Sequence, residues 1–180
     1  MTDRKKLFTV YFLLLAAAVL WNVAIVGAPW AAARGYRTVA AWLYLLFSPL
    51  CHQRPERSFL VFNQPFGVCN RCTGIYSGAL LGMVLFAVWG KSLRQGIDRD
   101  ERVQTPRRVY LFVALALMAA DVGSELLGIR STTPWSRYLT GAICGIVAPF
   151  YLLPSFFDLF LPNPEKNKFR SVVNQMVDRI

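Results

Sequence analysis

The sequence predicts an all-α protein, a polytopic bundle of helices that cross a membrane. Three observations favour this class. Of the 180 residues, 55% are hydrophobic and only 17% are charged, whereas about a quarter of the residues in a soluble domain are charged. Residues 7–29 and 73–90 contain no charged side chain. A helix of roughly 20 apolar residues is long enough to cross a bilayer core of about 30 Å. We therefore expect a multi-pass protein of the cell membrane.

The first two apolar segments differ in length. Residues 7–29 follow a basic start, MTDRKK, but no small-residue cleavage site clearly closes the segment. We therefore expect a retained spanning helix and not a signal peptide. Residues 36–50 provide only about fifteen residues, or roughly 22 Å of helix. We expect this second segment to be re-entrant, interfacial, or tilted with one end inside the membrane, which gives four to five membrane segments in all.

Three further apolar segments follow, at residues 73–90, 109–129 and 138–161. Pro149 and Pro154 fall inside the last of these, and because proline cannot donate a backbone hydrogen bond, we expect a kink or a loosened turn there. We take residues 1–161 as a single integral membrane domain and residues 162–180 as a polar C-terminal tail.

Glycines recur every four residues in two of these segments. Gly74, Gly78 and Gly82 share one helix face, and Gly141 and Gly145 repeat the pattern. Faces made of small residues let membrane helices approach closely. We interpret both sets as packing faces.

The formal net charge of +10 has a membrane interpretation. The basic residues lie between the apolar segments, where they suit anionic lipid headgroups and bias the orientation of short loops. We find no basic helix interleaved with stacking aromatic residues, so nucleic acid is not an expected partner. Membrane lipids are the expected partners, together with a small lipophilic substrate if the protein has one.

The side of the membrane that carries the 51–72 loop depends on the number of spans. With four spans, which we favour, the N-terminus, the basic 91–108 loop and the tail share the cytoplasmic side, and the 51–72 loop lies outside. With five spans, the 51–72 loop lies inside. Residues 30–72 hold five arginines and one glutamate, which is an argument for the second arrangement under the positive-inside rule.

The stretch CHQRPERSFLVFNQPFGVCNRC, residues 51–72, holds three of the four cysteines and the single histidine. A CxxC pair places two thiolates near enough to bind one metal ion. We therefore predict a transition-metal site formed by Cys51, His52, Cys69 and Cys72, with zinc first and iron second, because sulfur and imidazole suit both. Adjacent residues usually point in different directions, so His52 ligates only if the backbone turns there; otherwise it supports the site from outside the ligand set.

Two other interpretations of the cysteines stay open. Cys69 and Cys72 come directly before a predicted helix, whose N-terminus, together with Arg71, lowers the pKa of a thiol and favours disulfide exchange. A structural disulfide requires an oxidising compartment. Cys144 stands alone in an apolar segment, and we interpret it as a small packing residue.

Acidic residues also lie inside the apolar segments. Asp121 and Glu125 are four residues apart and share one helix face. A carboxylate inside a bilayer costs several kcal/mol, so it usually has a partner. We expect Arg71, Arg130 or Arg137 to supply the counter-charge, and a pair with Arg137 would lock two helices together. The other interpretation is a proton relay, a cation site or a catalytic group, with Asp121, Glu125 and Arg137 as candidates.

These motifs resemble those of a known family. The runs Cys51-His52-Gln53 and Cys69-Asn70-Arg71-Cys72-Thr73-Gly74-Ile75-Tyr76, with Pro55-Glu56-Arg57-Ser58-Phe59 between them and Gly78 after them, are similar to the signature CHQ…CxRCxG(I/L)YxG. That signature defines a family of small bacterial and archaeal membrane proteins of unknown function. The resemblance covers roughly residues 40–150 and extends more loosely to Asp121, Arg137 and Thr140-Gly141. It implies that the Cys/His cluster is one unit, and it implies no activity.

The expected function follows from the donor count. Four protein donors leave a metal ion no position for a substrate, so we first expect a structural metal in a protein with a scaffold, transport or assembly role. The alternative is a membrane enzyme, metal-dependent or thiol-redox, that acts on a lipid, a quinone or a partner protein's disulfide with Asp121, Glu125 and Arg137. This order reverses if His52 is not a ligand.

Overall fold

The structure is a computed structural model, and it describes residues 3–97, 108–128 and 132–160. Its elements, in chain order, are α1 (Asp3–Ala33), α2 (Arg37–Phe47), a short 3-10 helix (Pro55–Arg57), β1 (Leu60–Val61), β2 (Gln64–Pro65), α3 (Asn70–Ile97), α4 (Arg108–Leu126), α5 (Pro134–Val147) and α6 (Pro149–Phe160). Most of the predicted 91–108 loop, the predicted tail 162–180 and Arg130 lie outside the described residues.

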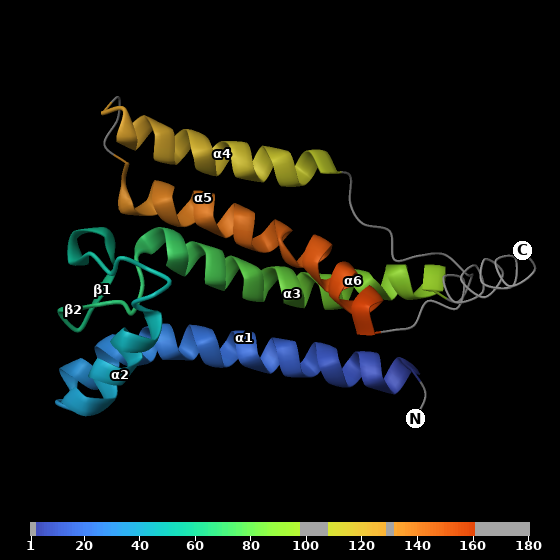
Figure 1. The fold of residues 1–180 in the computed structure, drawn as a ribbon, viewed down its shortest axis with the longest axis horizontal. Helices are drawn as coiled ribbons and strands as arrows, with labels where there is room; N and C mark the ends of the chain where they lie inside the picture. The colour runs from blue at the N-terminus through green and yellow to red at the C-terminus, as the bar shows by residue number, and fades with distance from the viewer. Residues whose placement is uncertain (1–2, 98–107, 129–131, 161–180) are drawn as a thin grey trace, which may run out of the picture.

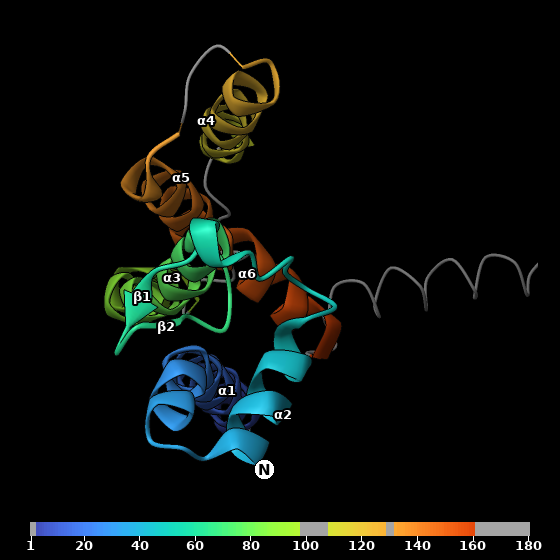
Figure 2. The same cartoon turned by 90° about the vertical axis from the view of Figure 1, so that its left-hand side faces the viewer.

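The long helices form a bundle in which neighbours lie side by side (Figure 1). Viewed from one end, the order across the bundle is α1, α3, α5, α4, with α2 beside α1 and α6 beside α3 (Figure 2). The same end carries α2, the 3-10 helix and the β1–β2 hairpin (Figure 1). The predicted fold class, an all-α bundle of membrane helices, is confirmed.

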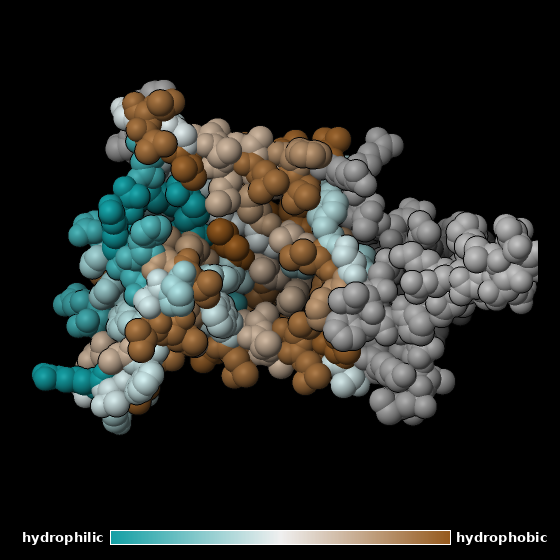
Figure 3. Space-filling view, in the orientation of Figure 1, coloured by the Kyte–Doolittle hydropathy of each residue, from teal (hydrophilic) through white to brown (hydrophobic). Residues whose placement is uncertain are grey.

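Four helical stretches in the described residues are long and apolar enough to cross a membrane: Phe8–Ala33, Asn70–Val88, Val109–Leu126 and Pro134–Phe156. The predicted short segment is α2, whose 11 residues give a helix of about 16 Å, too short for a core of about 30 Å. Apolar side chains cover the middle of the bundle, and hydrophilic ones gather at the end with the β1–β2 hairpin (Figure 3).

The last span starts earlier than its apolar run. Thr133 caps α5, because its hydroxyl accepts a hydrogen bond from the Ser136 N–H at 3.1 Å, and Pro134 occupies the first helical turn, as both residue types favour. The span then breaks at Ala148, directly before Pro149. Pro149 has no N–H to donate to the carbonyl four residues earlier, so the predicted interruption is confirmed there, whereas α6 continues through Pro154.

Helices α3 and α5 pack with backbone against backbone. A Cβ placed on Gly78 would lie 2.9 Å from the Cα of Ala142, and a Cβ on Gly145 would lie 2.8 Å from the backbone N of Ala79. Each glycine row therefore faces the other helix, and both predicted packing faces are confirmed. This close contact fixes the heights of α3 and α5 relative to each other.

A proline in α1 anchors the loop that precedes α3. Pro29 lies inside α1 and cannot donate to the carbonyl of Ile25, four residues earlier. The N–H of Gly67 donates to this carbonyl instead, at 3.2 Å. Gly67 is needed for this approach, since a Cβ there would lie 2.9 Å from Cδ2 of the buried Phe47.

Candidate metal centre

Three cysteines meet where α2 ends and α3 begins. Cys51 follows α2, and its N–H donates to the Phe47 carbonyl at 3.0 Å. Cys69 is the last residue before α3, and Cys72 lies in the first turn of that helix. The three sulfur atoms all lie within 4.8 Å of one another. All four cysteines are free thiols, and Cys51 is buried.

The loop between α2 and α3 is tied down by side chains at both ends. The amide of Gln53 donates to the carbonyls of Tyr44, at 2.7 Å, and Gly67, at 2.8 Å. Gln53 itself has a φ of 47°, which lies in the left-handed region of the backbone. The Tyr44 hydroxyl donates to the Pro65 carbonyl at 2.6 Å. These bonds hold the strand before Cys69 against α2.

Between the anchors, the chain forms a two-residue hairpin turn. Phe62 and Asn63 connect β1 to β2 and have φ values of 54° and 58°. Positive φ at both central residues is the geometry of a type I′ turn, which suits the twist of a hairpin. The hairpin shortens the path from Cys51 to Cys69, so residues eighteen positions apart can meet.

The cysteines pack within and against a buried apolar cluster. Ile25, Phe47, Cys51 and Val68 form one buried cluster, and Cys69 and Cys72 pack against it together with Trp21 and Tyr76. The Trp21 ring lies edge-on to Phe47, with centroids 5.1 Å apart. The thiols are therefore shielded from the lipid-facing side of the bundle.

The sulfur of Cys51 is the focus of several hydrogen bonds. The thiols of Cys69 and Cys72 and the backbone N–H of Cys69 hold the pKa of the Cys51 thiol well below its usual value, despite the opposing effect of burial. The Cys69 N–H lies 3.1 Å from the Cys51 sulfur. A thiolate is the form that binds a metal ion, so this lowering of the pKa favours metal binding by Cys51.

The sulfur spacing fits a metal ion. In a tetrahedral site with Zn–S bonds of about 2.3 Å, neighbouring sulfurs lie roughly 3.8 Å apart. Cys51, Cys69 and Cys72, with all sulfurs within 4.8 Å, approach this arrangement without a change in the fold. The chemistry of three thiols suits zinc or iron.

His52 is not in this group. The structure brings together the three cysteine sulfurs, and the group of metal-ligating atoms found among the described residues contains no imidazole. His52 is exposed and lines a neighbouring pocket. The candidate group in the described residues therefore holds three sulfur donors, and ligation by His52 stays a prediction.

Cys144 lies apart from this centre. Its thiol donates to the Ala114 carbonyl at 3.0 Å, which joins α5 to α4. This position agrees with the packing role expected for it.

A second polar cluster joins α3, α4 and α5. Arg71 of α3 contacts Asp121 of α4 at 2.5 Å and Glu125 at 3.7 Å. Arg137 of α5 contacts Glu125 at 2.9 Å, and Arg57 of the 3-10 helix contacts it at 2.8 Å. The predicted Glu125–Arg137 pair is present, and the ion-pair partner of Asp121 is Arg71.

Two threonine hydroxyl groups also contact the carboxylates of Asp121 and Glu125. Thr132 donates to Glu125 at 3.0 Å and accepts from Nε of Arg137 at 2.7 Å. Thr140 lies 3.4 Å from Asp121. Each carboxylate therefore has a guanidinium and a hydroxyl partner. This arrangement connects three helices, as expected for a structural lock, and it leaves a catalytic role for Asp121, Glu125 or Arg137 as a hypothesis.

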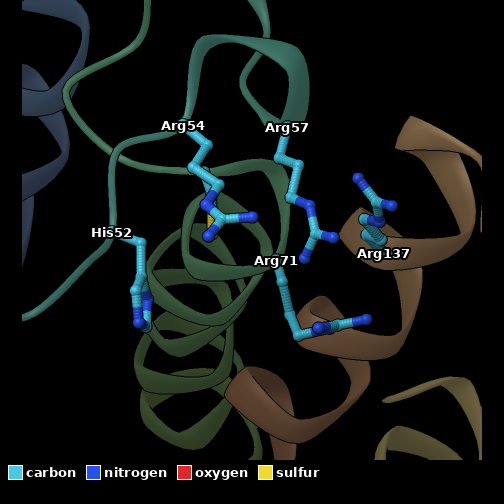
Figure 4. A pocket seen from close by; sticks show the side chains of 6 residues that line it. His52, Arg54, Arg57, Arg71 and Arg137 are labelled. Carbon is cyan, nitrogen blue, oxygen red and sulfur yellow. The ribbon is translucent and has the colours of Figure 1, made fainter. Parts of the chain in front are cut away.

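A pocket lies between the two clusters (Figure 4). It has a volume of about 280 Å³, and it is lined by His52, Arg54, Arg57, Cys69, Arg71 and Arg137. One wall includes a cysteine of the sulfur group, and another includes two arginines of the ion-pair cluster. The sequence prediction missed Arg54 and Arg57. The signal that could have found them is the run of arginines between the first and third cysteines.

Comparison with known proteins places these residues in a shared region. A family model described as predicted membrane protein (DUF2085) matches residues 51–151, which include the sulfur group, the pocket and the ion pairs. An uncharacterised protein of Methanocaldococcus jannaschii is 34% identical over 154 residues, which is 83% of this chain and 94% of that protein. An uncharacterised protein of Methanothermobacter thermautotrophicus is 54% identical over 102 residues, 56% of this chain and 81% of that protein. No solved structure matches the chain significantly.

Proposed function

The chain belongs to the DUF2085 family of predicted membrane proteins, and we propose that it is a metal-dependent membrane protein with an open metal site. It is a multi-pass protein with a cysteine group that can hold a metal ion. In the proposal, Cys51, Cys69 and Cys72 bind a transition metal, zinc first and iron second. The fourth coordination position stays available to a ligand that enters the pocket.

The donor count is the observation that carries the proposal. Structural zinc sites are closed by four protein ligands, whereas catalytic sites keep three protein ligands and one open position. The described part of the chain groups three donor atoms, and His52 lies at the neighbouring pocket. The structure therefore favours the enzyme interpretation over the structural one, which is the reverse of the order that a four-donor site would give.

The chain's own residues suit a reaction on an anionic group. A bound zinc ion would polarise an oxygen of the ligand or activate a water molecule. Arg71 and Arg137 are held by Asp121 and Glu125, so their guanidinium groups are oriented before a ligand arrives. Fixed positive charge beside a metal stabilises negative charge that develops during a reaction.

A second function, a structural metal, is favoured by one observation. The cysteines join the end of α2 to the start of α3 over a buried apolar cluster, which is where a metal ion would hold the loop in place. A thiol-redox function, without a metal, is the remaining alternative, because the cysteines are free and close together.

The first experiment measures metal in the full chain, purified in mild detergent under reducing conditions without chelators. We expect about one equivalent of zinc or iron per chain, as for a site whose ligands are pre-arranged. Cys69→Ser should lower the metal content to background, and His52→Ala should leave it unchanged. Less than about a tenth of an equivalent in the wild type would reject a metal site and leave the thiol-redox function.

The second experiment tests whether the site is open. The protein is loaded with cobalt, and its visible spectrum is recorded before and after addition of a small exogenous thiol. An open position binds the thiol and changes the spectrum, both in the wild type and in His52→Ala. A spectrum that ignores the thiol in the wild type and changes only after His52→Ala would indicate a closed, structural site with His52 as the fourth ligand.

A further inference from the structure

The pocket beside the sulfur group is strongly cationic. Four of its lining residues are arginines, at positions 54, 57, 71 and 137, and arginine stays protonated in proteins. Two carboxylates, Asp121 and Glu125, pair with three of these arginines. The arginines around this pocket therefore outnumber the carboxylates that pair with them.

The arginines are not fully paired by the protein. Arg54 forms no ion pair with a carboxylate within the described ranges 3–97, 108–128 and 132–160. The Nε of Arg71 is buried and finds no hydrogen-bond acceptor in the same ranges. Buried donors without a partner are uncommon because they lose the hydrogen bonds that water would make. These groups suit an acceptor that comes from a ligand.

Two arginines of the pocket lie at the ends of helical stretches long enough to cross a membrane. Arg71 is the second residue of the span Asn70–Val88, and Arg137 is the fourth residue of the span Pro134–Phe156. Both positions are at the end of the bundle where hydrophilic side chains gather (Figure 3). The polar headgroup layers add several ångströms on each side of the bilayer core. A ligand with one charged end and an apolar remainder can place its charged end here.

We propose that this pocket binds a phosphate group. Four arginines against two carboxylates give this side of the pocket a net positive charge, which suits an anionic phosphate group. Arginine presents two parallel N–H groups that fit the oxygens of a phosphate. The volume, about 280 Å³, lies just below the usual range for ligand pockets, so it accommodates a headgroup and not a whole lipid. The phosphate belongs either to a lipid headgroup or to a water-soluble phosphate compound.

This inference deepens the proposed function, because Cys69 lines the same pocket and a phosphate oxygen could then occupy the open metal position. Binding of the phosphate itself rests on the arginines. The metal site and the phosphate site can therefore be tested, and can fail, separately.

The test uses the full chain in nanodiscs and two probes. One probe is glycerol 3-phosphate, added to the solution around discs of neutral phosphatidylcholine. The other is phosphatidic acid, incorporated in the same discs and followed by its retention on the protein in native mass spectrometry. The variant is Arg54→Gln, which removes a pocket charge that no described carboxylate balances. The matched control is Arg34→Gln, an exposed arginine in the turn after α1 that does not line the pocket.

We expect at least one probe to bind, and we expect Arg54→Gln to weaken that binding about tenfold, because a charge-assisted hydrogen bond is lost. Arg34→Gln should change binding less than about twofold, as for a screened charge outside the site. Binding of both probes indicates a site open to water. Binding of phosphatidic acid alone indicates a lipid headgroup site.

Two results would overturn the inference: neither probe binds the wild type, or the two arginine variants weaken binding equally. Metal content is measured on the same samples. Phosphate binding without metal would reject the proposed metal site alone, and metal without phosphate binding would reject the phosphate site alone.

Discussion

The close contact between α3 and α5 opposes the gain in helix stability that replacing glycine by alanine usually brings. Gly78→Ala should destabilise the protein, although alanine is the better helix former. A Cβ on Gly78 would lie 2.9 Å from the Cα of Ala142, closer still to its carbonyl oxygen, and 3.0 Å from its carbonyl carbon. Ordinary contacts of a Cβ fall at 3.4–4 Å. The obstructing atoms belong to a helix backbone, so no side-chain rotation can relieve them.

The magnitude follows from two opposing effects. Replacing glycine by alanine inside a helix stabilises it by about 0.8–1.0 kcal/mol. Inserting a methyl group into a filled contact costs roughly 1–3 kcal/mol, and here the two helices must separate by at least about 0.5 Å to restore ordinary contact. Since the neighbouring atoms are backbone, the upper part of that range applies. We expect a net loss of about 1–2 kcal/mol in the free energy of unfolding.

A matched control exists on α4. Gly123 is also helical, and a Cβ there would meet no atom within 4 Å. Gly123→Ala should therefore leave stability unchanged or raise it by up to about 1 kcal/mol. Both variants are unfolded by a denaturing detergent titration in the same mild detergent, with tryptophan fluorescence as the signal. If Gly78→Ala is as stable as Gly123→Ala, the close packing of α3 on α5 is refuted.

Three other substitutions test the site. Asp121→Asn should lower the unfolding free energy by about 2–4 kcal/mol in the same titration, because Arg71 loses its nearest counter-charge where its side chain is only 18% exposed. Adding Arg71→Met to this variant should recover about half of the loss. If the losses from the two single variants are fully additive, the pairing is contradicted. Gln53→Ala removes two hydrogen bonds to backbone carbonyls and should lower the free energy of unfolding by about 1–3 kcal/mol. Alkylation of Cys51 in metal-free protein, followed by mass spectrometry, should then become faster. An unchanged alkylation rate would argue against this anchor. Gly67→Ala should destabilise the protein by about 1–3 kcal/mol, because the buried ring of Phe47 lies 2.9 Å from the added Cβ. Thermal unfolding unchanged from the wild type would contradict this close contact.

The spans and the cysteine group were predictable because their signals are local. A run of about twenty apolar residues is enough to specify a membrane helix, and four of the five apolar segments gave spans of that kind. The short run 36–50 gave α2, with 11 residues. The CxxC spacing placed Cys69 and Cys72 one helical turn apart, although Cys72 lies inside α3 and does not precede it. The expectation that Cys51 lies near Cys69 and Cys72 rested only on its place in the same polar stretch, residues 51–72.

The donor count and the pocket were not predictable because they depend on the path of the chain. The positive φ of Gln53 and the hydrogen bonds of its amide fix the path of the backbone just after His52. The bond from Gly67 to the carbonyl freed by Pro29 decides where the chain returns. No local pattern shows that a proline in α1 will meet a glycine almost forty residues later. Arg54 and Arg57 converge on Arg71 only because of this path.

The ion pairs also could not be predicted from local sequence, because they depend on how the helices pack. The sequence indicated that Asp121 would have an arginine partner, but the choice of Arg71 depends on the relative height of α3 and α5. Gly141 sets that height, because a Cβ there would meet the carbonyl oxygen of Arg71 and would lie 3.2 Å from the N of Ile75. Arg137 is four residues, or about 6 Å, before Gly141.

The height of α5 relative to α3 also positions two arginines of the pocket. Because Gly141 of α5 lies against the backbone of Arg71 of α3, Arg137 projects from the turn that extends beyond it, toward the loop that carries the cysteines. Arg71 from α3 and Arg137 from α5 then both line the pocket (Figure 4). Glycine packing inside the membrane therefore determines the spacing of the charges at its surface. A substitution that separates α3 from α5, such as Gly78→Ala, should weaken phosphate binding even though it lies two turns away from Arg71.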